Sequence, residues 1–165
     1  MVSLLVVLLR CRLLDVVAMD VDAVPDDSTV IADGAINQVI KIIRSFSPNI
    51  IVCNSRDRIL DIKSEHIKDK DYALESFGWH TTLTGTTIYN KNVISKIQTL
   101  DLNEFKNFPH IGIIFQSLID NCSFYWESKQ LVWSHKDKQS YWSSNIFETF
   151  IIDFYRAIFF LPEQY

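Results

Sequence analysis

The chain has 165 residues, of which 48% are hydrophobic and 13% are aromatic, and its formal net charge is -4 at pH 7. A chain of this length and composition is expected to fold as one domain with a sizeable core, which excludes a disordered tail. Because the net charge is not basic, nucleic acid is not expected as the main partner.

The first residues are apolar, but they lack the features of a targeting segment. The apolar run from Val2 to Leu9 is shorter than the roughly 20 residues that a membrane-spanning helix needs. A signal peptide carries positive charge before its apolar run, whereas Arg10 and Arg12 come after it here. We therefore expect a buried strand or helix at this end, and a cytoplasmic location for the chain.

Short apolar runs alternate with one amphipathic segment in the first half of the chain. Leu13 to Met19 is short and rich in valine, which predicts a buried strand. After a predicted loop from Ala23 to Asp33, apolar residues recur at helical spacing from Gly34 to Phe46, which predicts a helix that Asp33 can cap. Ile50 to Ile59 begins apolar and turns polar, which predicts a second strand.

The same alternation continues in the second half. The β-branched segment Leu83 to Asn90 predicts a strand, and "CSFYWES" and "QLVWSH" predict two paired strands. The charged segment Lys63 to Asp71 is expected to be an exposed loop. Helices are predicted from apolar spacing at Tyr72–Trp79, Lys91–Ile97, His110–Ile119 and Trp142–Phe160. One α/β domain over residues 1–165 is the simplest account of this order.

An acidic pair comes directly after the first predicted strand. Asp20 and Asp22 form an Asp-x-Asp, and on extended backbone their side chains point to the same side. Open α/β sheets bind ligands at the carboxyl ends of their strands. Carboxylates suit Mg²⁺ or Mn²⁺, and Mg²⁺ is commonly held together with substrate phosphates. The pattern predicts a divalent cation site beside a phosphorylated ligand, and the alternative is a solvated turn that includes Asp26 and Asp27.

Several segments, taken in order, resemble the second half of a family 2 glycosyltransferase, an enzyme of the GT-A fold. The resemblance covers about residues 13 to 165, the acceptor-side half and the C-terminal extension of such an enzyme. The segments are "AMDVDAVPDD", "GAINQVIKIIRSFSPNIIVCNSR", "GTTIYNKNVISKI", "FPHIGIIFQSLIDN" and "IFFLPEQY". The resemblance implies a partial GT-A-like (Rossmann-like) mixed sheet flanked by helices, with a helical C-terminal extension.

The resemblance also implies an activity in polysaccharide biosynthesis. Such enzymes transfer a sugar from a nucleotide diphosphate donor to a glycan or lipid-linked acceptor. Asp20 and Asp22 would then lie near the donor diphosphate and its Mn²⁺ or Mg²⁺, which acts as a Lewis acid. A further residue must accept the acceptor's proton, and the candidates near the start of the later helix are Glu104 and His110, with Asp101 beside them.

Two features depart from the family pattern. Many members carry another acid directly after the second Asp, where this chain has Ala23. The family also has a nucleotide-binding half that begins with a strand resembling "IIIPTYN", and nothing like it precedes Leu13. The expected enzyme is therefore an incomplete one, without its base-binding pocket.

Two other functions fit parts of the sequence. The segment "VVAMDVDAV" resembles the first motif of the haloacid-dehalogenase-like phosphatases, although the Gly-Thr that usually follows is missing. A non-catalytic interaction module is the other alternative. The predicted helix Trp142–Phe160 is apolar nearly all round, so it could be buried, drive self-association, or lie on the inner face of a membrane.

Four further side chains each have two interpretations. Trp79 can stack on a sugar ring or pack in the core, and core packing is the commoner role. His80 is expected to be a structural hydrogen-bonding residue rather than a catalyst. Arg56 and Arg58 can bind phosphate or form a solvated strand end, which is the commoner case.

Overall fold

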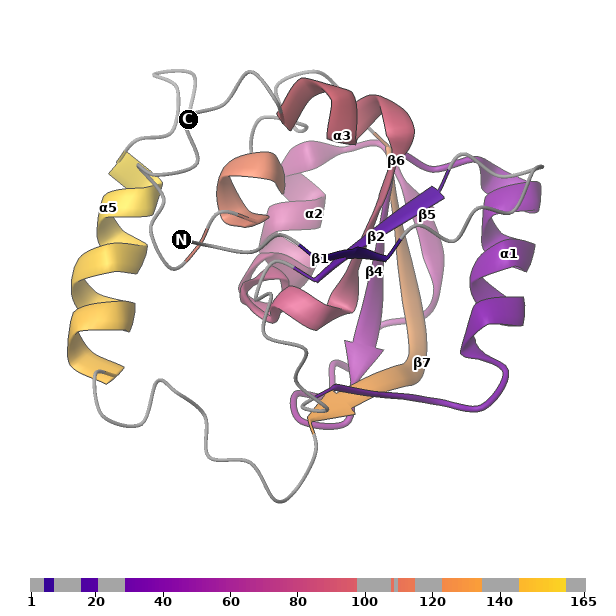
Figure 1. Ribbon diagram of the computed structural model, residues 1–165, viewed down its shortest axis with the longest axis horizontal. Helices are drawn as coiled ribbons and strands as arrows, with labels where there is room; N and C mark the ends of the chain where they lie inside the picture. Colours follow the sequence, from indigo (N-terminus) through magenta and orange to yellow (C-terminus); the bar gives the residue numbers. More distant parts are fainter. Residues whose placement is uncertain are drawn as a thin grey trace.

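The computed structural model describes residues 5–7, 16–20, 29–97, 108, 110–114, 123–134 and 146–159. Within these residues, seven strands form one mixed sheet with helices packed against it, as expected for an α/β protein (Figure 1). The strands are β1 (Leu5–Val7), β2 (Val16–Asp20), β3 (Thr29–Ile31), β4 (Ile50–Ser55), β5 (Glu65–Ile67), β6 (Thr87–Asn90) and β7 (Phe124–Ser134). Their order is β1-β2-β6-β4-β7-β3, and β5 pairs with β7 off this path.

The strand directions bring the ends of β2 and β4 to one edge of the sheet. β6 lies between these two strands and is antiparallel to both, so β2 and β4 run in the same direction. Ala18 of β2 and Ile51 of β4 both pair with Ile88, which sets the two strands level. Among the described strands, the neighbours of β2 are β1 and β6, both antiparallel to it, whereas β4 pairs in parallel with β7.

Helix α1 (Ala35–Phe46) covers one face of the sheet, and its bounds are close to those predicted. Its buried residues Ala35 and Ile42 pack with Ile51 and Cys53 of β4. The prediction that Asp33 caps this helix is wrong. The cap position is Gly34, which has a φ of 76° and makes no side-chain cap hydrogen bond. A left-handed backbone of this kind favours glycine because glycine has no Cβ.

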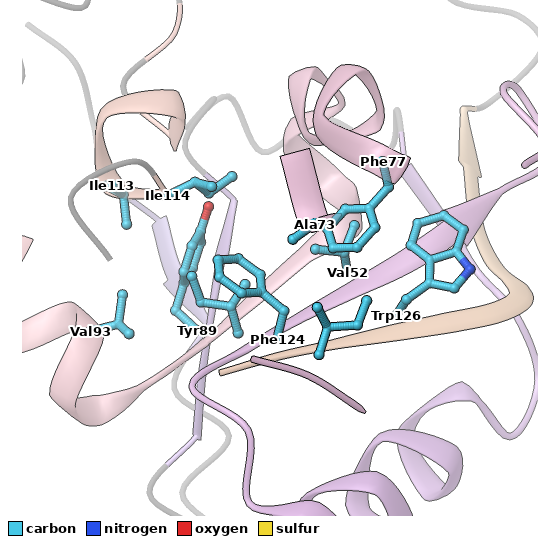
Figure 2. Close-up of a cluster of buried hydrophobic side chains, with 11 residues drawn as sticks. Val52, Ala73, Phe77, Tyr89, Val93, Ile113, Ile114, Phe124 and Trp126 are labelled. Atoms are coloured by element: carbon cyan, nitrogen blue, oxygen red, sulfur yellow. The ribbon is translucent and has the colours of Figure 1, made fainter. Parts of the chain in front are cut away.

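The opposite face carries the larger core, which is drawn in Figure 2. Helices α2 (Lys70–Phe77) and α3 (Lys91–Ile97) and the helical residues 110–114 pack there. β4 supplies Ile50 and Val52 to this face, so all six of its residues are buried between two helical layers. Burial on both faces explains why β4 is continuously apolar at its start rather than alternating. Its partners in this core include Phe77, Phe124 and Trp126.

Several predicted strands differ from the structure. The two paired strands predicted around Phe124–Ser134 form one continuous strand of 11 residues, β7. Only Lys129 separates the two predicted segments, and neither it nor its neighbours Ser128 and Gln130 is a glycine, proline or asparagine that could make a tight turn. The pairing of β7 with β4 instead shifts register around Asn54, as in a β-bulge, and β7 bends along its length (Figure 1).

Segments predicted as loops also contain strands. β3 lies in the predicted loop before α1, and β5 lies in the predicted exposed loop, where Ile67 is buried. β4 ends at Ser55 rather than Ile59. The 3-10 turn η2 (Thr84–Thr86) occupies the start of the strand predicted at Leu83–Asn90, and the 3-10 turn η1 (Gly78–Thr82) replaces the end of the helix predicted at Tyr72–Trp79. The predicted strand start at Leu13 and the helix beyond residue 114 lie outside the described residues.

The C-terminal helix is described over residues 146–159, with a π-helical stretch, η5 (Glu148–Asp153), that leads into α5 (Phe154–Phe159). Two polar side chains of this helix, Thr149 and Asp153, are buried, and the half-buried Phe150 and Phe154 contact Phe108. Its large apolar side chains on the other side are exposed: Ile146, Phe147, Ile151, Ile152 and Tyr155. In the described part of the chain, no helix is both long and apolar enough to cross a bilayer.

Candidate functional site

The candidate site is the sheet edge at which β2 and β4 end and β6 begins. Asp20 is the last residue of β2, and Ser55 is the last residue of β4. Ala18 and Ile51 both pair with Ile88. Asp20 follows Ala18 by two residues and Cys53 follows Ile51 by two residues, so Asp20 and Cys53 are also level with each other. The turn η2 contacts both strands, so it belongs to the same edge. The predicted position of Asp20, at the end of a strand, is therefore correct.

The predicted cation ligands fit the chemistry of a hard divalent ion. Asp22 lies outside the described residues. Within the described part of the chain, no group of three or more His, Cys, Asp or Glu side chains is arranged to hold a metal ion. Two carboxylates are nevertheless a sufficient protein contribution for Mg²⁺, which takes its other ligands from phosphate oxygens and water. The cation site at Asp20 and Asp22 stays a prediction.

Asn54 fixes the backbone at the end of β4. Its buried side-chain amide nitrogen donates to the carbonyl oxygens of Leu60, at 2.9 Å, and of Ser128, at 3.0 Å. Its side-chain oxygen accepts from the backbone nitrogens of Ser55, at 3.1 Å, and of Leu60, at 3.2 Å. One side chain thus ties the loop after β4 to the bulge in β7, and this makes the edge rigid.

Both arginines after β4 stack on tryptophan rings. The guanidinium of Arg58 lies 4.8 Å from the centre of the Trp79 ring. It also donates to the Trp79 carbonyl oxygen and, at 2.8 Å, to the Thr82 hydroxyl. Partial burial lowers the pKa of Arg58, although a guanidinium stays charged at neutral pH. Arg56 lies 3.8 Å from the centre of the Trp133 ring, so neither residue is a simply solvated strand end.

His80 is a buried anchor of this edge, in line with the structural role expected for it. Its Nε2 lies 2.9 Å from the carbonyl oxygen of Cys53, and its ring meets the Trp126 ring edge-on at 5.0 Å. Burial lowers the pKa of His80 to about 4, and the charge of Arg58 acts in the same direction. The imidazole is therefore neutral at pH 7, and Nε2 carries the proton because a carbonyl oxygen can only accept.

His110, one of the two predicted base candidates, is also buried. It begins the helical residues 110–114, and its ring lies 6.0 Å from that of Phe108. Burial lowers its pKa to about 4, and the backbone of Thr82 opposes part of this shift. Because the imidazole of His110 is neutral and buried, a structural role suits it better than the role of a catalytic base. The other candidate, Glu104, lies outside the described residues, so the identity of the base stays a prediction.

The sequence analysis missed Glu127, a buried carboxylate in β7. Its oxygens accept from the side chains of Gln38, at 2.6 Å, and Ser64, at 2.9 Å, and from the backbone nitrogen of Lys129, at 2.9 Å. The signal that could have found it is a lone acid within the aromatic segment "FYWES". Burial raises the pKa of the Cys53 thiol to about 12, with a smaller contribution from Glu127, so Cys53 is not a nucleophile.

Three side chains that were considered one at a time in the sequence are brought together in the structure. Arg58, Trp79 and His80 lie together at the end of β4, on the same edge as Asp20. No protein-family model matches this sequence, and no curated protein is significantly similar to it. The functional proposal therefore rests on the sequence pattern and on the geometry of this edge.

Proposed function

We propose that this chain is part of a glycosyltransferase that moves a sugar from a nucleotide diphosphate donor to a glycan or lipid-linked acceptor. The observation that carries the proposal is the position of the Asp-x-Asp. Its first acid, Asp20, ends β2 at the edge where β4 also ends. Strand ends on one edge of an open α/β sheet are where such folds bind ligands.

The charges of the reaction explain why acids would be used at this position. A donor diphosphate is negatively charged, and it takes on more negative charge as the sugar leaves. A divalent cation, when bound, would neutralise that charge. The role of this chain is then to hold the cation through Asp20 and Asp22, at a backbone position made rigid by the neighbouring strands. Two carboxylates without a cation would repel the diphosphate instead.

The rigidity of the edge is the second line of support. Asn54 makes four hydrogen bonds with the backbone around the end of β4. Arg58 donates a hydrogen bond to the carbonyl oxygen of Trp79 in η1. A site that must hold a leaving group and an acceptor in one geometry benefits from such fixed surroundings. The acceptor's proton would pass to Glu104 or His110, as the resemblance implies.

Calorimetry with nucleoside diphosphates tests the proposal. The wild-type chain is titrated with uridine, guanosine and thymidine diphosphates, each with and without Mn²⁺. We expect binding of at least one of them to require Mn²⁺, and we expect Asp20→Asn and Asp22→Asn each to weaken it about tenfold or more. Asp33→Asn is the matched control, because Asp33 is exposed and makes no cap hydrogen bond. Binding that needs no cation and is unchanged in Asp20→Asn would refute the proposal.

One observation favours a second candidate, a non-catalytic interaction module. The C-terminal helix exposes Phe147, Ile151 and Tyr155, each more than half accessible to solvent. Exposed apolar side chains gathered on one helix are typical of interaction surfaces. Sedimentation velocity separates the two candidates. Self-association that Phe147→Ser and Ile151→Ser abolish, together with no nucleotide binding, would favour the module. Mn²⁺-independent hydrolysis of a phosphate ester would agree with neither candidate.

A further inference from the structure

Trp79 is exposed at the candidate edge, and this overturns the expectation that it packs in the core. Its relative accessibility is 56%, whereas Trp126 is fully covered. Trp79 lies in η1, next to His80, and the His80 ring is hydrogen-bonded to the carbonyl oxygen of Cys53 in β4. Other large apolar side chains are exposed as well, but Trp79 differs from them in lying under the Arg58 guanidinium next to the end of β4.

The Trp79 ring is held in place rather than free to rotate. The Arg58 guanidinium lies over it, and Arg58 is itself fixed by bonds to the Trp79 carbonyl and the Thr82 hydroxyl. The rings of Phe150 and Phe154 approach it from the C-terminal helix, at 6.2 Å and 6.0 Å between ring centres. Arg58 and the C-terminal helix therefore both orient the indole, although most of its surface is exposed to solvent.

We propose that Trp79 is a stacking platform for a pyranose ring. One face of a pyranose presents C–H groups, which suit the negative face of an indole, and its rim presents hydroxyl groups, which need hydrogen-bond partners. Trp79 offers the flat apolar surface, and Arg58 offers charged donors beside it. This assignment rests on the proposed glycosyltransferase function, which supplies the carbohydrate, and it adds a sugar-binding residue to the acidic edge.

The surroundings of Trp79 favour a sugar over a protein partner. Small-molecule sites combine an aromatic surface with a few fixed polar groups. The guanidinium of Arg58 is such a group. The buried Thr82 hydroxyl holds it in place, because it accepts from Arg58 and donates to the Trp79 carbonyl oxygen. The exposed side chains of the C-terminal helix, by contrast, are mainly large apolar ones, although Glu148 and Arg156 are exposed beside them. The two surfaces therefore differ in chemistry, and the one at the strand ends is the one that suits a polyhydroxylated ring.

The test follows the indole N–H signals of the four tryptophans by NMR, with the Trp79 signal assigned from Trp79→Phe. The full chain is titrated with methyl pyranosides of glucose, galactose, mannose and rhamnose. It is then titrated with nucleoside diphosphates and the matching nucleotide sugars in Mn²⁺. We expect at least one pyranoside or nucleotide sugar to move the Trp79 signal selectively. Movement by a free pyranoside indicates the acceptor, and movement by a nucleotide sugar but not by its diphosphate indicates the donor sugar.

Substitutions measure the contribution of the ring. We expect Trp79→Ala to weaken carbohydrate binding about tenfold, which corresponds to about 1.4 kcal/mol, and Trp79→Phe to weaken it less. Trp133→Phe is the matched control, because Trp133 is also stacked under an arginine but lies on β7. Nucleoside diphosphate binding should be unchanged in all three variants.

The outcomes separate the platform from the proposed function. If nucleoside diphosphates bind through Asp20 and no sugar moves the Trp79 signal, the platform is wrong and the proposed function stands. If a pyranoside binds through Trp79 but no nucleotide binds, the proposed function is wrong and the platform stands. If Trp79→Ala abolishes self-association and no sugar binds, Trp79 belongs to a protein interface and the platform is wrong.

Discussion

Because His80 is buried, we expect this protein to lose stability at mildly acidic pH. Its ring is fully covered, and its pKa is lowered to about 4 from the ordinary 6.5. Above pH 6.5 the imidazole is neutral in both the folded and the unfolded chain, so it makes no pH-dependent contribution. Below pH 6.5 the unfolded chain binds a proton that the folded chain cannot bind. The free energy of unfolding therefore falls as the pH drops from 6.5 to about 4.

The size of the effect follows from the pKa difference. A change from 6.5 to about 4 corresponds to about 3 kcal/mol of stability lost by pH 4. His110 has the same lowered pKa for the same reason, burial, so it adds a similar loss. Together these losses are comparable to the whole stability of a typical domain, about 5–15 kcal/mol. We therefore expect unfolding between about pH 6 and pH 4.

Urea denaturation at pH 7.5, 6.5, 5.5 and 4.5 measures this dependence. His80→Gln keeps a donor for the Cys53 carbonyl but cannot titrate, so its stability should fall more slowly with acid than that of the wild type. The expected difference in slope approaches about 1.4 kcal/mol per pH unit between the two pKa values. Asn54→Ala is the control, because it weakens the same edge without removing a titrating group. Equal slopes for His80→Gln and the wild type would show that the pKa of His80 is not lowered in the folded protein.

Three further predictions concern the core and its buried polar groups. Trp126→Ala should cost about 3–5 kcal/mol by urea denaturation, because the ring is fully buried, and a loss below 1 kcal/mol would contradict this packing. Glu127→Leu should cost about 1–3 kcal/mol, because it leaves three donors without their acceptor, whereas Glu127→Gln should cost less. Cys53 should resist a thiol reagent at pH 8 in the folded protein and react in urea, since burial raises its pKa to about 12; fast native reaction would show that it is not buried.

Elements with a strong local signal were predictable from the sequence. α3 has the predicted bounds, Lys91–Ile97, and α1 differs from its prediction by one residue at its start. The regular spacing of apolar residues marks such helices without knowledge of their partners, because the spacing reflects one face turned to a core. The start of β4 at Ile50 was found for a similar reason, since a run of β-branched residues favours extended backbone.

The candidate site was predictable only in part. The end of a strand at Asp20 could be placed from the change between apolar and acidic residues. Its neighbours could not, because Trp79 comes to this edge through contacts with Arg58 and the C-terminal helix. Glu127 is buried only because Gln38 and Ser64, both far away in sequence, supply its hydrogen bonds. No local pattern records such partners.

The sequence pattern alone was therefore enough to place α1, α3 and the end of β2 at Asp20. The tertiary structure decided that β7 is one bent strand, that Ile67 is covered, and that Trp79 is left open. It also turned Thr149 and Asp153 of an apolar helix inward. The physical reason is that periodicity reports how neighbours along the chain alternate between core and water, whereas burial depends on which distant segments pack against them.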